Sequence, residues 1–105
     1  MKQQNLAHNV FFTLKNTSGK AVEALIEDCY SYLKDIPGII YFSAGSLIEE
    51  HNRDVNIRDF QVGLHVIFVN KNYHDKYQVA EKHNIFVERN KDNWAQVRVF
   101  DTCIR

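Results

Sequence analysis

The chain has 105 residues, 45% of them apolar, which suits a single domain spanning residues 1–105. Thirteen basic residues balance thirteen acidic ones, so the basic excess typical of nucleic-acid-binding proteins is missing. No apolar run approaches the roughly 20 residues that a membrane span needs, and the polar start does not resemble a signal peptide. These features predict a cytoplasmic domain that binds neither nucleic acid nor membrane.

The chain begins with a predicted strand followed by a predicted helix. Residues 8–15 are rich in β-forming side chains. Thr17 or Ser18 can then cap a helix over residues 20–34. Apolar residues recur along that helix at helical spacing, at Val22, Leu25, Ile26, Cys29, Tyr32 and Leu33. The Pro-Gly pair at 37–38 ends the helix.

The rest of the chain predicts three more strands and a second helical region. Residues 39–47 and the strongly apolar residues 60–69 are predicted strands, separated by a charged, exposed connection at 49–59. Residues 73–94 are predicted to be helical, in one piece or two, and residues 97–104 form the last strand. The order βαββαβ predicts an α+β fold of the ferredoxin-like type, with a four-stranded antiparallel sheet and helices on one face.

Apolar residues occupy both faces of the predicted strands. In residues 60–69 one face carries Val62, Leu64, Val66 and Phe68, and the other carries Gly63, His65, Ile67 and Val69. Helices can cover only one face, so we expect a second copy of the chain to cover the other. The predicted assembly is a homodimer whose two sheets form a barrel through their outer faces. The alternative is a solvated second face with scattered apolar residues.

Several features, in chain order, resemble a known family. They are His8 at the start of the first strand, the DIPG sequence at 35–38, the segment from Tyr77 to Phe86, Trp94, and the VRVFD sequence at 97–101. The set is similar to the stress-responsive A/B barrel domain, often called Dabb, of the dimeric α/β-barrel group. The resemblance implies homodimers, and many members have no known activity.

The resemblance also implies candidate site residues. One relative, a plant polyketide cyclase, closes a ring by aldol chemistry without a cofactor. By position, Tyr77 and His83 match a tyrosine and a histidine that line its pocket between helices and sheet. A further pocket histidine of that relative corresponds to His8.

The chain also departs from the family pattern. Ala80 and Glu81 stand where the family commonly has histidine and proline, and Val62 replaces a pocket histidine of the third strand. In an unbroken helix, six residues place Tyr77 and His83 about 120° apart, so they would not face one pocket. Because residues 80–82 all favour helix, the sequence gives no reason for a break between Tyr77 and His83. Packing without a catalytic role is the alternative for both residues.

If Tyr77 and His83 meet, their chemistry is complementary. A histidine can accept a proton near neutral pH, and a tyrosine can donate a hydrogen bond to a developing oxyanion. The pair would suit removal of a proton next to a carbonyl group. The residues predicted to line a ligand pocket around them are His8, Val10, Phe12, Phe42, Val62, Leu64, Phe86 and Trp94.

The remaining histidines and the cysteines suggest no metal or cofactor site. His65 lies on the opposite face of its strand, and His51 and His74 are predicted to be solvated. Neither these histidines nor Cys29 and Cys103 show the short repeated spacing of a structural zinc site.

Three functional hypotheses remain from the sequence. The protein binds a small apolar or carbonyl-bearing molecule without catalysis, or it is a cofactor-free cyclase, lyase or small monooxygenase, or it is a structural, stress-protective oligomer. A cavity into which Tyr77 and His83 both point would favour the enzyme. A space filled by Phe12, Phe42, Phe86 and Trp94 would favour the structural protein.

Overall fold

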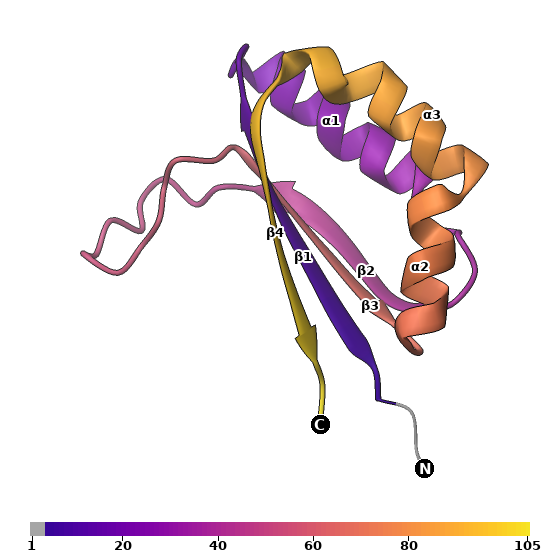
Figure 1. Cartoon of the computed structure of the whole chain (residues 1–105). Helices are drawn as coiled ribbons and strands as arrows, with labels where there is room; N and C mark the ends of the chain where they lie inside the picture. The colour runs from indigo at the N-terminus through magenta and orange to yellow at the C-terminus, as the bar shows by residue number, and fades with distance from the viewer. Residues whose placement is uncertain (1–3) are drawn as a thin grey trace.

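The predicted ferredoxin-like α+β fold is confirmed by a computed structural model, which describes residues 4–105. The elements are β1 (Leu6–Leu14), α1 (Gly19–Tyr32), β2 (Ile39–Ser46), β3 (Val62–Phe68), α2 (Lys71–Val79), α3 (Glu81–Asn90), a 3-10 turn (Lys91–Asn93) and β4 (Trp94–Cys103). The sheet has the order β2-β3-β1-β4, and all neighbouring strands are antiparallel. Figure 1 shows the three helices on one face of this sheet.

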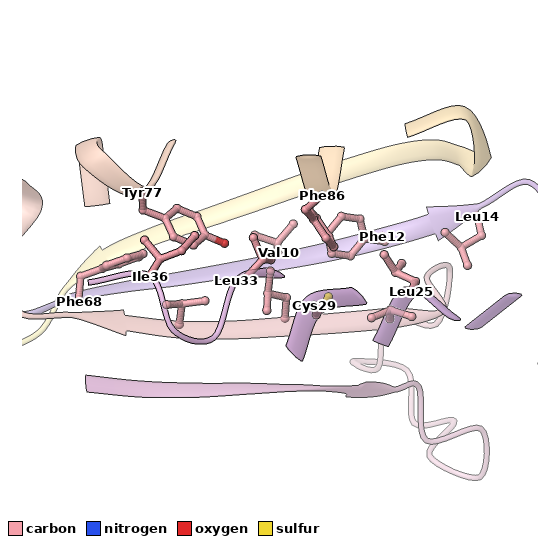
Figure 2. Packing of buried hydrophobic residues seen from close by; sticks show 13 residues of the cluster. Val10, Phe12, Leu14, Leu25, Cys29, Leu33, Ile36, Phe68, Tyr77 and Phe86 are labelled. Carbon is pink, nitrogen blue, oxygen red and sulfur yellow. The ribbon is translucent and has the colours of Figure 1, made fainter. Parts of the chain in front are cut away.

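The main core lies between the helices and the inner face of the sheet. Strands β1 and β3 contribute Val10, Phe12, Leu14, Val62, Leu64, Val66 and Phe68. The helices and the turn after α1 contribute Leu25, Cys29, Leu33, Ile36, Tyr77 and Phe86, all of which Figure 2 labels. Alternate residues of β1 and β3 therefore point into the core, as the sequence predicted.

Local sequence signals position α1. The Ser18 hydroxyl accepts a hydrogen bond from the backbone N–H of Ala21, which caps the helix as predicted. After the helix, Gly38 has a φ angle of 93°, and a Cβ atom at this position would overlap the Tyr73 ring. Glycine is therefore required both by its backbone conformation and by the close approach of α2.

The helical region predicted over 73–94, in one piece or two, consists of two helices and ends before Trp94. Trp94 begins β4 instead of ending the helix, and Ala80 separates α2 from α3 with an extended backbone (φ −65°, ψ 144°). Tyr77 and Phe86 are both buried, yet nine residues of continuous helix would turn them about 180° apart. The break allows both side chains to pack on the sheet, so tertiary packing overrides the helix propensity of Ala80.

No helix of residues 4–105 covers the outer face of the sheet. Tyr41 on β2 and Phe100 on β4 remain 52% and 55% exposed, while Phe11 and Ile67 are half-buried. Residues 47–61 form a long arm that projects away from the helices (Figure 1). The base of this arm is held by an ion pair between Arg98 and Asp59, at 2.6 Å. The chain on its own thus leaves a partly apolar surface open to solvent.

Candidate functional site

A cavity of about 160 Å³ lies between the inner face of the sheet and the junction of α2 with α3. Its lining residues are His8, Val10, Phe12, Leu64, Tyr77, Gln78, His83, Phe86, Val87, Trp94, Val97 and Val99. Val97 and Val99 belong to β4, an edge strand whose inner face the helices leave largely uncovered. The cavity is therefore apolar over most of its wall and reaches the uncovered edge of the sheet.

Most residues proposed from the sequence gather around this cavity. Tyr77 and His83 both line it, as do six of the predicted pocket residues: His8, Val10, Phe12, Leu64, Phe86 and Trp94. Phe42 does not line it, because β2 is the opposite edge strand and Phe42 packs against Tyr30 at 5.3 Å between ring centroids. Val62 is also outside the lining, because the main core buries it completely.

His8 is oriented by a carboxylate that the sequence reasoning missed. Its Nδ1 atom lies 2.6 Å from Oδ1 of Asp101, the residue directly opposite it in the β1–β4 pairing. A carboxylate can only accept here, so Nδ1 carries the proton and Nε2 keeps a free lone pair. Burial lowers the pKa of His8, and the hydrogen bond to Asp101 opposes this only in part. The imidazole is therefore neutral at pH 7 and able to accept a proton.

Tyr77 and His83 meet because the chain breaks at Ala80. Their ring centroids are 4.8 Å apart in an edge-on arrangement, and Tyr77 also lies 5.8 Å from the His8 ring. The sequence-based expectation that they face different directions is therefore wrong. Burial raises the pKa of Tyr77, so its hydroxyl stays protonated and can donate a hydrogen bond. Burial also lowers the pKa of His83, with smaller contributions from His8 and His74.

Two nitrogen atoms of residues that line the cavity have no hydrogen-bond partner. Nδ1 of His83 and Nε1 of Trp94 are both buried, and neither is paired within residues 4–105. Buried polar atoms without partners are uncommon in folded proteins, and each requires an explanation. A bound molecule with a polar group would supply the missing hydrogen bonds.

His74 is not solvated, contrary to the sequence-based expectation. Its side chain is only 16% exposed, and its ring lies 4.9 Å from that of His8 and 5.5 Å from that of Phe68. One ligand atom from each of His8, His74 and Asp101 lies within 4.8 Å of the others. Of the two remaining histidines, His65 accompanies Asn9 on the outer face and His51 is exposed on the arm.

Sequence comparison places the chain in a family. The model of the stress responsive A/B barrel domain, Dabb, matches residues 6–104. This chain belongs to that family. The resemblance seen in the sequence is thereby confirmed. No curated protein sequence is similar enough to count as a match.

Solved structures of Dabb and other ferredoxin-like proteins share the fold of this Dabb domain. A Dabb family protein from Mesorhizobium loti has a TM-score of 0.81 at 22% identity, covering 98% of this chain and 99% of its own. A dimeric ferredoxin-like protein of unknown function from Thermobifida fusca also has a TM-score of 0.81, at 13% identity over 99% and 94%. A hydroxynitrile lyase from Passiflora edulis has a TM-score of 0.75 at 18% identity over 97% and 94%.

The helices provide no candidate for a membrane span. Within residues 4–105, none is long and apolar enough to cross a bilayer.

Proposed function

We propose that this Dabb protein binds a small carbonyl-bearing molecule in the cavity and transfers a proton next to the carbonyl group. The observation that carries the proposal is the meeting of His8, Tyr77 and His83 around one small apolar cavity. Enzyme active sites commonly place a few titratable groups with shifted pKa values in such an enclosure. Of the three hypotheses from the sequence, this geometry therefore favours the enzyme.

The cavity limits the class of ligand. At about 160 Å³ it is smaller than the roughly 300–1,000 Å³ of pockets for drug-sized molecules. Its apolar walls suit a short hydrocarbon group, and its few polar atoms suit one oxygen-bearing function. We therefore expect an aldehyde or ketone of modest size.

His8, Tyr77 and Asp101 each have a distinct part in the proposed reaction. Nε2 of His8 takes a proton from the carbon next to the carbonyl, and the C–H bond electrons form an enolate. The Tyr77 hydroxyl donates a hydrogen bond to the enolate oxygen. Asp101, 2.6 Å from Nδ1, stabilises the imidazolium that His8 has become. Return of the proton from Nε2 to the product completes the cycle.

Hydrogen–deuterium exchange gives a direct test that needs no knowledge of the natural substrate. NMR in D₂O would follow the loss of α-proton signals from a panel of small aldehydes and ketones. We expect the wild type to accelerate exchange and His8→Gln to lower that rate by about 10²–10⁴. His51→Gln, which changes an exposed histidine of the arm, is the matched control and should exchange at the wild-type rate.

Two results would count against catalysis. Exchange equally fast in wild type and His8→Gln would show that His8 is not the base. Carbonyl compounds that bind, as seen by shifts of amide signals, without faster exchange would indicate a binding protein without catalysis, which is the first hypothesis from the sequence.

The proposed working form is a homodimer. The outer face carries half-exposed Tyr41 and Phe100, which a second copy would cover to close the barrel. Solved ferredoxin-like proteins from Thermobifida fusca, Bacteroides fragilis and Jannaschia are described as dimeric. Light scattering should give twice the mass of one chain, and Ile67→Lys on the outer face should give monomer or aggregate. A monomeric wild type would contradict this form.

A further inference from the structure

We propose that His8, His74 and Asp101 form a binding site for one divalent transition-metal ion per chain. The three residues come from β1, α2 and β4, and their nearest ligand atoms all lie within 4.8 Å of one another. Two imidazoles with one carboxylate are a ligand set that binds Zn²⁺ and related ions, with positions left open for water. The site shares His8 with the cavity, but the other two ligands lie outside the cavity lining.

The distances require only small side-chain movements. Zinc takes its ligands at about 2.0–2.2 Å, so neighbouring ligand atoms of a tetrahedral site stand about 3.4 Å apart. His8 Nδ1 and Asp101 Oδ1, now 2.6 Å apart, would separate, and the widest spacing of 4.8 Å would shorten. The Asp101 side chain is 42% exposed and sits on an edge strand, so it can adjust, while buried His8 stays fixed.

One ring nitrogen of His74, Nε2, makes only a long contact, which an ion could displace. Nδ1 of His74 lies 3.3 Å from Oδ1 of Asp75, which itself pairs with Lys71 at 2.8 Å. The Gln78 amide nitrogen lies 3.5 Å from Nε2 of His74, as expected if Nε2 is the acceptor. A histidine that donates one ring N–H to a carboxylate is the usual arrangement for a metal ligand.

Charge and access are also suitable. Among the groups facing the site, Asp101 and Asp75 are acidic, and Lys71 is held by Asp75. A divalent cation would offset the acidic pair. The partly exposed side chains of His74 and Asp101 provide the path from solvent.

Metal binding would change the tautomer of His8. An ion on Nδ1 replaces the proton shared with Asp101, and that proton moves through solvent to Nε2, so the ring stays neutral. Nε2 would then donate a hydrogen bond into the cavity in place of accepting a proton. This consequence alone rests on the proposed function: Zn²⁺ should slow α-proton exchange.

Zinc titration of the metal-free protein tests the site without any substrate. The full chain, untagged and treated with chelator, would be titrated with ZnCl₂ at pH 7 by calorimetry. We expect one Zn²⁺ per chain, and binding weakened at least tenfold by either His74→Ala or Asp101→Asn. His51→Ala is the matched control and should bind as the wild type does, because His51 lies on the arm.

A second measurement uses the wild type alone, so it does not depend on how the variants fold. Long-range ¹H–¹⁵N NMR of the histidine rings should show Zn²⁺ shifting the ring nitrogens of His8 and His74 but not those of His51. No binding, binding unchanged in both His74→Ala and Asp101→Asn, or shifts confined to other histidines would overturn the proposal. If the protein binds zinc but does not accelerate α-proton exchange, the metal site is supported and only the proposed catalysis is contradicted.

Discussion

The two ends of the helix-covered sheet face differ sharply in chemistry. Under α1 the buried side chains include Leu25, Cys29 and Leu33, and the last two are fully inaccessible to solvent. Under α2 and α3 lie His8, Tyr77 and His83 around a cavity. Figure 2 shows the separation, with Tyr77 and Phe68 at one end of the cluster and Leu25 and Leu14 at the other. The end under α1 is a packed apolar core that stabilises the fold, whereas the end under α2 and α3 contains polar side chains and a cavity.

Truncation under α1 should have the largest effect on stability. Leu33→Ala removes a fully buried side chain, and we expect it to lower the free energy of unfolding by about 2–5 kcal/mol. Urea denaturation followed by circular dichroism measures the loss. Val55→Ala, on the exposed arm, should change the same quantity by less than about 0.5 kcal/mol. Equal losses in the two variants would mean that α1 does not provide the main core.

Removal of a single hydroxyl group beside the cavity should lower the rate of the proposed reaction without changing the stability of the fold. Tyr77→Phe keeps the buried ring, which is 1% exposed, and removes only the hydroxyl proposed to face the oxyanion. Loss of such a donor costs roughly 10²–10³ in rate. We expect that drop in α-proton exchange, with an unfolding midpoint close to that of the wild type. A variant that is destabilised but exchanges normally would make Tyr77 a packing residue only.

The buried histidines beside the cavity, His8 and His83, should also make the stability of the fold depend on pH. Burial lowers the pKa values of His8 and His83 below their ordinary 6.5, so between the folded and unfolded pKa values the unfolded chain binds more protons. Stability is therefore complete above about pH 6.5 and falls as the pH is lowered through the folded pKa values.

Urea titrations from pH 8 to pH 5 would measure this dependence. We expect His83→Gln to flatten the curve. Cys29→Ala should leave its slope unchanged, because burial holds the pKa of Cys29 at about 12, far above this range. A His83→Gln curve as steep as that of the wild type would assign the pH dependence to other groups.

The smallest expected effect on stability concerns the helix break at Ala80, which brings Tyr77 and His83 together. Glu81 is the first residue of α3 and follows extended Ala80, a pair of positions that suits proline. We expect Glu81→Pro to raise the free energy of unfolding by about 0.4–1 kcal/mol, because it restricts the unfolded chain. Glu88→Pro, inside α3, is the matched control and should cost about 3 kcal/mol or more. Destabilisation by Glu81→Pro would contradict a rigid break at Ala80.

Most of the fold was predictable, and the site was predictable only in part. Alternation in β1 and β3 and the apolar spacing of α1 gave the correct elements, because each pattern reports burial on one side of a local structure. Tyr77, His83 and His8 were proposed from the family resemblance, and all three line the cavity. Asp101 was missed, although it alternates with Val97 and Val99 along β4 and lies opposite His8 of β1.

By itself, the sequence determined the order of strands and helices, the helix cap at Ser18 and the end of the first helix before the Pro-Gly pair at 37–38, since these depend on neighbouring residues. Only the tertiary structure decided the break at Ala80, which lets Tyr77 and Phe86 both reach the sheet. It also decided the meeting of His8 with Asp101, 93 residues away, and with His74. Such contacts depend on strand pairing and helix docking, which no local pattern of residues encodes.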